Sequence, residues 1–110
     1  MRILSGIAPS GSIHIGNYLG AISQWKELQE IGECIFFIAD LHALTASRNP
    51  KTFSKEMLET ATELLATGLN PEKCIIFVQS QVKEHTELCW LLNTLTPVGE
   101  LERMTQYKEK

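Results

Sequence analysis

The chain has 110 residues, enough for one small domain with a modest core. Its composition, 44% hydrophobic and 21% charged, is that of a globular protein, and its net charge of −3 argues against a general nucleic-acid binder. No apolar run approaches the roughly 20 residues of a membrane span, and the N-terminus shows no secretory pattern. The three cysteines form no Cys-x-x-Cys pair. We therefore expect a cytoplasmic protein with reduced thiols.

The first part of the chain alternates strand and helix patterns. Residues 2–7 are predicted to form a short strand, and the apolar spacing of residues 15–31 predicts an amphipathic helix that ends before Gly32. Residues 34–39 are continuously apolar, which is typical of a parallel strand covered on both faces. We expect a loop over residues 40–49.

The same alternation continues towards the C-terminus. Asn49 and Pro50 are a suitable cap and first residue for a second helix, which ends near Gly68. Residues 74–78 predict a third buried strand, and leucines at helical spacing predict a third helix that Pro97 ends. The last eleven residues, 100–110, are predicted to form a short helical turn and a polar tail.

Three strand–helix units predict an α/β fold, a three-layer half of a doubly wound, Rossmann-type nucleotide-binding domain. Right-handed crossovers favour a parallel sheet in the order 3-2-1, and we expect helices on both faces. The first strand is then an edge strand, and ligands bind at the carboxyl ends of the strands. Three polar segments follow those ends: residues 8–17, 40–42 and 79–81.

The most informative segment is Pro9-Ser10-Gly11, where the first strand ends, together with the helix that follows. A helix start presents free backbone N–H groups and the positive end of the helix dipole, and both attract phosphate. His14 and Asn17 are three residues apart on one face of the first turn, so both can donate hydrogen bonds to one triphosphate. The segment matches neither the Gly-x-Gly-x-x-Gly pattern nor a Walker A motif.

Asp40 and His42 follow the second strand and allow three interpretations. They could bind a metal ion, but two ligands do not make a site and no third is near, so we predict no metal site. Asp40 could bond to loop amides in a structural role. Both residues could instead line a substrate pocket.

Three stretches of the chain resemble the signatures of one enzyme family. His14-Ile15-Gly16-Asn17, followed by Tyr18-Leu19-Gly20, resembles the first signature of the class I aminoacyl-tRNA synthetases, in the form carried by the tryptophanyl branch. The stretches from Ala39 to Thr45 and from Gly99 to Lys110 are similar to later parts of the same branch, in the same order. The resemblance spans nearly the whole chain.

The resemblance implies roles for individual residues. The residues that would act in catalysis, by contacting the triphosphate, are His14, Asn17 and Lys110. An adenine nucleotide would lie in a cradle formed by Ala8, Pro9, Ser10, Gly16 and Asn17, although family members often have Gln where Ala8 stands. The substrate pocket would be lined by Gly6, Ala39, Asp40 and His42.

The same resemblance implies an enzyme that activates L-tryptophan with ATP and Mg²⁺, transfers it to tRNA(Trp), and is a homodimer when complete. Residues 1–110 would be the N-terminal half of its catalytic domain. The rest of that domain, with its Lys-Met-Ser-Lys-Ser loop, and the anticodon-binding helices would lie beyond Lys110. Two alternatives stay open: a tyrosyl relative or small nucleotidylyltransferase, and a non-catalytic synthetase-like module that binds a nucleotide or a protein partner.

Overall fold

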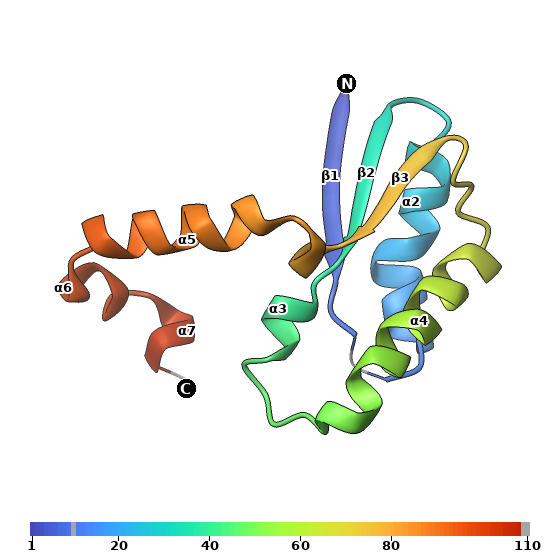
Figure 1. Cartoon of the computed structure of the whole chain (residues 1–110). Coiled ribbons are helices and arrows are strands. Elements are labelled where there is room, and N and C mark those ends of the chain that lie inside the picture. Colours follow the sequence, from blue (N-terminus) through green and yellow to red (C-terminus); the bar gives the residue numbers. More distant parts are fainter. Residues whose placement is uncertain (10, 109–110) are drawn as a thin grey trace.

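A computed structural model describes residues 1–9 and 11–108 of the chain (Figure 1). The elements in chain order are β1 (Arg2–Ile7), α1 (Ile15–Asn17), η1 (Tyr18–Ile22), α2 (Ser23–Leu28), β2 (Glu33–Ile38), α3 (Asp40–Ala43), α4 (Pro50–Ala66), β3 (Cys74–Val78), η2 (Gln79–Gln81), α5 (Lys83–Leu95), α6 (Val98–Leu101) and α7 (Thr105–Lys108). Among these described residues, no helix has the length and apolar character needed to cross a bilayer.

The three strands form one parallel sheet in the order β1-β2-β3, which is the predicted order 3-2-1 seen from the other edge. Ile3 lies beside Cys34 and Cys34 beside Cys74, so residues paired in this way point to the same face. Within the described residues, β1 is an edge strand, as expected. The predicted fold class is confirmed.

One face of the sheet carries the core. Phe36 and Ile38 of β2 are fully buried under α2 and α4, together with Ile22 and Leu64 from the helices. Trp25 of α2 stacks on Phe36 with ring centroids 4.4 Å apart and an interplanar angle of 7°. Such a pair contributes about 0.5–1.5 kcal/mol beyond its buried area, so these rings fix how the first helix lies on the sheet.

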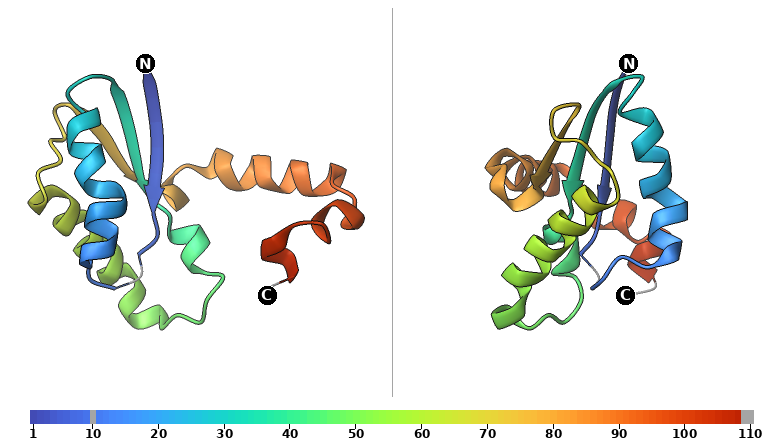
Figure 2. Two further views of the ribbon diagram at one scale, coloured as in Figure 1. Left: turned by 180° about the vertical axis from the view of Figure 1, so that it is seen from behind. Right: turned by 90° about the vertical axis from the view of Figure 1, so that its right-hand side faces the viewer.

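The opposite face is only partly covered. Leu4 of β1 is 66% exposed there, and Phe37 of β2 places its ring directly over Gly6. A hollow of about 480 Å³ separates these strand residues from α5 and is lined on the helix side by His85 and Leu88. Figure 2 shows α2 and α5 on opposite sides of the strands. Helices therefore lie on both faces, but the close packing is on one.

The first helix is shorter and less regular than predicted. Its regular turns, α1 and α2, are joined by η1, a π-helical turn that contains Gly20, and the helix ends at Leu28 rather than at residue 31. The chain then turns through Gly32, whose N–H donates to the Leu28 carbonyl. The side chain of Gln29, at the end of this helix, is buried and bonds to Gly68 and Asn70, so a tertiary contact holds the chain at this point.

The second correction concerns the loop predicted over residues 40–49. Asp40–Ala43 forms the single helical turn α3, in which the Leu44 N–H donates to the Asp40 carbonyl. The turn exists because the Asp40 side chain is tied to another element, as described below. No local pattern in the sequence distinguishes so short a helix from a loop.

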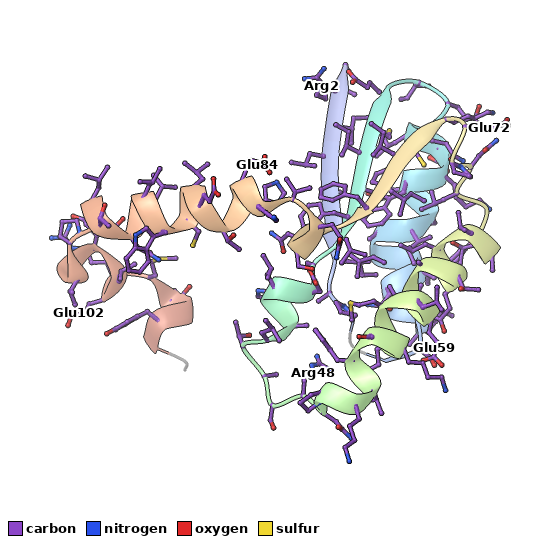
Figure 3. The ribbon with its side chains drawn as sticks, viewed as in Figure 1. Arg2, Arg48, Glu59, Glu72, Glu84 and Glu102 are labelled. Carbon is purple, nitrogen blue, oxygen red and sulfur yellow. The ribbon has the colours of Figure 1, made fainter. Side chains whose placement is uncertain are left out.

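The C-terminal quarter forms an arm that extends away from the sheet. Figure 3 shows Glu84 at the start of the arm beside the strands and Glu102 near its far end. Within the described part of the chain, no residue of α5 or α6 is buried. Trp90 is 70% exposed on this arm.

Candidate nucleotide-binding site

The three segments that follow the strands meet at one edge of the sheet. The Ala39 N–H donates to the Ile7 carbonyl at 2.8 Å, which joins the ends of β1 and β2. The Ser80 N–H donates to Asp40 Oδ1 at 3.0 Å, which joins the segments after β2 and β3. The structure thus brings the predicted segments together at the carboxyl edge, where doubly wound folds bind ligands.

His14 and Asn17 hold each other in place at the start of α1. His14 Nδ1 accepts hydrogen bonds from the N–H groups of Gly16 (3.1 Å) and Asn17 (3.4 Å). In return, Asn17 Oδ1 accepts from the His14 N–H at 3.2 Å. This reciprocal arrangement is a capping box, in which each side chain satisfies backbone donors of the first turn.

The capping box contradicts the expectation of free backbone N–H groups at this helix start, but it supports the expectation that His14 and Asn17 are donors. The amides of Gly16 and Asn17 are not free, because His14 Nδ1 occupies both. An Nδ1 that accepts hydrogen bonds places the proton of the neutral imidazole on Nε2. Asn17 likewise uses its carbonyl oxygen, which leaves the Nδ2 amide as its donor. The polar atoms of both side chains that remain outside the box are therefore donors, as a phosphate ligand requires.

Gly16 is required by the close packing of this turn. A Cβ at this position would lie 3.0 Å from the imidazole ring of His14. Any larger residue would push the ring away from the backbone amides that it caps. The glycine in this signature therefore has a physical role in positioning the histidine.

The other described residues of the predicted cradle lie at the end of β1. Pro9 is fully buried and Ala8 is half-buried at the end of β1. Gly11, in the loop that follows, has φ +97°, a conformation that favours glycine. Two predicted site residues, Ser10 and Lys110, lie outside the described residues.

Asp40 has a structural role in this arrangement. The residue is 6% exposed, and its Oδ1 accepts from the N–H of Leu41 and from the N–H of Ser80, both at 3.0 Å. His42 is exposed on the same turn. Within the described residues, no hydrogen bond joins Asp40 or His42 to His14 or Asn17.

Gly6 and Ala39 lie close to this edge of the sheet. The Phe37 ring would be 2.5 Å from a Cβ at Gly6, so only glycine leaves room for this ring in its present position. Ala39 is half-buried at the end of β2. Among the described residues, no group of three or more His, Cys, Asp and Glu side chains has the arrangement of a metal site.

Glu63 lies beside the candidate site, although the sequence did not indicate it. Its Oε2 accepts a hydrogen bond from the Ile13 N–H at 2.9 Å, across fifty positions of the chain. This bond attaches the segment before α1 to the last turn of α4. Glu63 also lines a hollow of about 410 Å³ beside His14 and Tyr18. A carboxylate on its wall disfavours an anionic ligand in this hollow.

Comparison with known proteins agrees with this geometry. The family model described as tRNA synthetases class I (W and Y) matches residues 1–110. The chain belongs to this family.

Its relatives within the family can be stated more narrowly. The chain is 55% identical over 108 residues to the tryptophan–tRNA ligase of Rickettsia conorii and 54% identical over 109 residues to that of Prochlorococcus marinus subsp. pastoris. These matches cover 98% and 99% of this chain but 33% and 32% of the two relatives, so the chain spans about a third of their length.

A solved structure shows the same fold. The tryptophanyl-tRNA synthetase from Campylobacter jejuni, complexed with ADP and tryptophan, superposes with a TM-score of 0.91 at 44% identity. The match covers 99% of this chain and 34% of that structure. The resemblance noted from the sequence, to the tryptophanyl branch of the class I synthetases, is confirmed.

Proposed function

We propose that this chain supplies the ATP-cradling segment of a tryptophan–tRNA ligase. The enzyme joins the carboxylate of L-tryptophan to the α-phosphorus of ATP, releases pyrophosphate, and transfers the tryptophanyl group to tRNA(Trp). Residues 1–110 are the N-terminal half of the catalytic domain in this proposal. Its main support is the capping box, which leaves donor atoms of His14 and Asn17 at the carboxyl edge of the sheet.

The chemistry requires stabilisation of charge rather than proton transfer. The tryptophan carboxylate is already ionised at pH 7 and needs no general base. Negative charge builds on the phosphorus centre and on the departing pyrophosphate, and oriented donors lower the barrier. His14 Nε2–H and the Asn17 amide are the donors proposed for this role, with Lys110 as a third group.

The remaining residues of the cradle provide shape. Ala8, Pro9, Ser10 and Gly16 form the backbone path along which the adenine nucleotide lies in this proposal. Gly6, Ala39, Asp40 and His42 line the amino-acid side, where Asp40 acts through the loop that it holds and His42 offers an exposed ring.

Mg²⁺ enters the proposal as the partner of ATP. Because the described residues hold no cluster of three ligating side chains, the triphosphate oxygens would be its main ligands, as is usual for this cation. We further infer that the complete enzyme is a cytoplasmic homodimer, in keeping with the family resemblance.

Two substitutions separate the proposed donor role from the structural one. Asn17→Asp keeps an oxygen that accepts from the His14 N–H but replaces the donor amide with a negative charge. His14→Ser keeps a capping oxygen but removes the Nε2–H donor. In the protein encoded by the complete gene, we expect each variant to slow tryptophan-dependent exchange of pyrophosphate into ATP by roughly 10²–10³-fold.

The controls address stability and specificity. Urea unfolding should show that both variants remain folded, and the KM for tryptophan should change less than the exchange rate. Tyrosine in place of tryptophan tests the tyrosyl alternative, and full exchange activity in both variants would rule out the proposed donor role. A wild-type protein without any amino-acid-dependent exchange would instead favour the non-catalytic module.

A further inference from the structure

We propose that Cys34 and Cys74 form a dithiol pair at the starting edge of the sheet, which closes to a disulfide by exchange with a small disulfide. The two cysteines are direct partners in the register of β2 and β3. They are 1% and 6% exposed and belong to the same core cluster. The site lies at the opposite end of the strands from the carboxyl edge, so the inference does not depend on the proposed function.

The register brings the two residues within bonding range. Neighbouring strands lie about 4.7–4.9 Å apart, and disulfides join residues whose Cα atoms are about 4.4–6.8 Å apart. Because both side chains leave the sheet on the same face, the Cβ vectors need not reverse for the sulfurs to meet. Burial raises the pKa of the Cys74 thiol, and the neighbouring Cys34 raises it further, so the thiolate is a minor form at neutral pH and exchange becomes faster as the pH rises.

A surface hollow gives access to the pair. Its volume is about 160 Å³, and both Cys34 and Cys74 line it, together with Pro71 and Lys73. Cys74 also borders a larger hollow of about 470 Å³ next to Ala61 of α4. Cys74 therefore borders two hollows, and Cys34 lies next to it at the first, so a small reagent needs only a local opening to reach the sulfurs.

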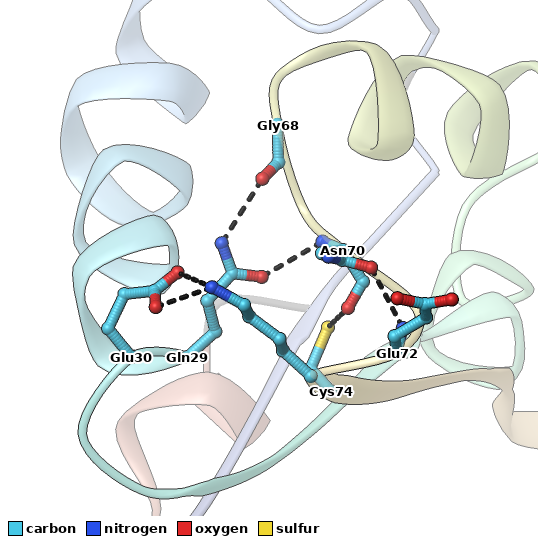
Figure 4. Close-up of polar contacts among 7 residues, drawn as sticks. Gln29, Glu30, Gly68, Asn70, Glu72 and Cys74 are labelled. Carbon is cyan, nitrogen blue, oxygen red and sulfur yellow. Dashed lines mark hydrogen bonds and ion pairs between the residues drawn. The ribbon is translucent and has the colours of Figure 1, made fainter.

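The loop before β3 keeps Cys74 in this position (Figure 4). Cys74 Sγ–H donates to the Asn70 carbonyl at 3.3 Å, and the Asn70 N–H donates to Gln29 Oε1 at 2.9 Å. Gln29 Nε2 in turn donates to the Gly68 carbonyl at 3.1 Å. The loop is thus fixed to the end of the first helix at Gly68 and Asn70, and the thiol has a defined place.

Charged groups around the hollow select the reagent. Lys73 Nζ forms an ion pair with Glu30 at 2.6 Å, and Glu33 and Glu72 also line the hollow. Glu33 is paired with Arg2 at 3.0 Å, so three carboxylates face two cations; the net negative charge around the hollow disfavours anionic reagents. The site therefore takes small neutral disulfides more readily than charged ones such as oxidised glutathione.

The reaction balances as two exchange steps. The Cys74 thiolate attacks one sulfur of the reagent, forming a mixed disulfide and releasing one small thiol. The Cys34 thiolate then attacks the Cys74 sulfur of the mixed disulfide, which forms the Cys34–Cys74 bond and releases the second small thiol. Two protein thiols are oxidised, and one reagent disulfide is reduced to two thiols.

The test uses this chain with Cys89→Ser, because Cys89 on α5 is the exposed cysteine and would react by itself. The folded protein is incubated with 2-hydroxyethyl disulfide, and its intact mass and peptide map are recorded. We expect a product two hydrogen atoms lighter, with the peptides of Cys34 and Cys74 joined. The urea midpoint of this product should rise by about 1–2 M, since the bond closes a long loop, and reductant should reverse both changes.

Variants with a single remaining core cysteine serve as matched controls. Cys34→Ser and Cys74→Ser, each combined with Cys89→Ser, should yield at most a mixed disulfide. With oxidised glutathione, closure should be at least several-fold slower. Folded protein that keeps both thiols free, carries two separate reagent groups, or closes only in urea would overturn the proposal.

Discussion

The reciprocal bonds between His14 and Asn17 show how two side chains acquire one function. Their spacing predicted that both would lie on one face of the first helical turn. That they cap each other could not be predicted, because the orientation of each ring or amide depends on the chain direction after Pro9. As a consequence, the groups that remain for a ligand, His14 Nε2–H and the Asn17 Nδ2 amide, are both hydrogen-bond donors. The spacing of the two residues did not by itself predict this.

Glu63 illustrates what a local sequence pattern misses at the residue scale. It belongs to α4, fifty positions from its partner Ile13, and no local pattern distinguishes it from the other glutamates of that helix. Only the crossover that lays α4 beside the first helix brings the two together. A residue of this kind can be found only once the packing is known.

The Glu63–Ile13 bond leads to a prediction about stability. Glu63→Leu removes the acceptor and should lower the free energy of unfolding by about 1–2 kcal/mol, because a partly buried N–H loses its partner. Glu63→Gln keeps an acceptor oxygen and should lower it by less than about 1 kcal/mol. Urea denaturation measures both values, and amide hydrogen exchange at Ile13 should accelerate only in the leucine variant. Equal stability of the two variants would contradict this role.

At the scale of elements, helix starts were easier to predict than helix interiors. The Asn49-Pro50 pair predicted the start of α4, and Asn49 Oδ1 does accept from the Lys51 N–H at 3.0 Å. By contrast, neither the π-helical turn η1 nor the short helix α3 was predicted, and α3 is held by a tertiary contact. The Asp40 carboxylate accepts a hydrogen bond from the Ser80 N–H, forty positions away. A local sequence pattern does not predict such a contact.

The cap of α4 offers a quantitative test. Asn49→Ala should lower the free energy of unfolding by about 1 kcal/mol, since the first turn loses a side-chain acceptor. Asn49→Asp keeps the acceptor and adds a charge that suits the positive end of the helix dipole, so its stability should match or exceed that of the wild type. Thermal unfolding followed by circular dichroism distinguishes these outcomes, and an alanine variant as stable as the aspartate variant would show that the cap is dispensable.

At the scale of the whole molecule, the order of the strands and the face of the core were predictable from the apolar runs. Continuous apolar strands also predicted cover on both faces, yet Leu4 and Ile75 remain largely exposed on the second face. The reason is that α5 departs from the sheet instead of lying along it. The direction of a helix after a strand depends on partners that a pattern of leucines does not specify.

The same architecture predicts weak binding of ATP by this chain alone. The capping box supplies donors from one wall only, and the hollow beside it carries the Glu63 carboxylate. Calorimetric titration with ATP and Mg²⁺ should therefore give a dissociation constant no tighter than about 1 mM, roughly 4 kcal/mol of binding free energy. Asn17→Asp should abolish even this signal, and micromolar binding by the wild-type chain would mean that one wall is sufficient.

The two tryptophans, finally, make the chain its own optical reporter. Trp25 is stacked against Phe36 in the core, whereas Trp90 stands in solvent on the arm. Acrylamide should quench the emission of Trp90 and leave that of Trp25 almost untouched, so two populations of fluorescence can be separated without any label. Unfolding of the core should shift the emission maximum of Trp25 to longer wavelength. Binding of another molecule to the arm should shift the emission maximum of Trp90 to shorter wavelength.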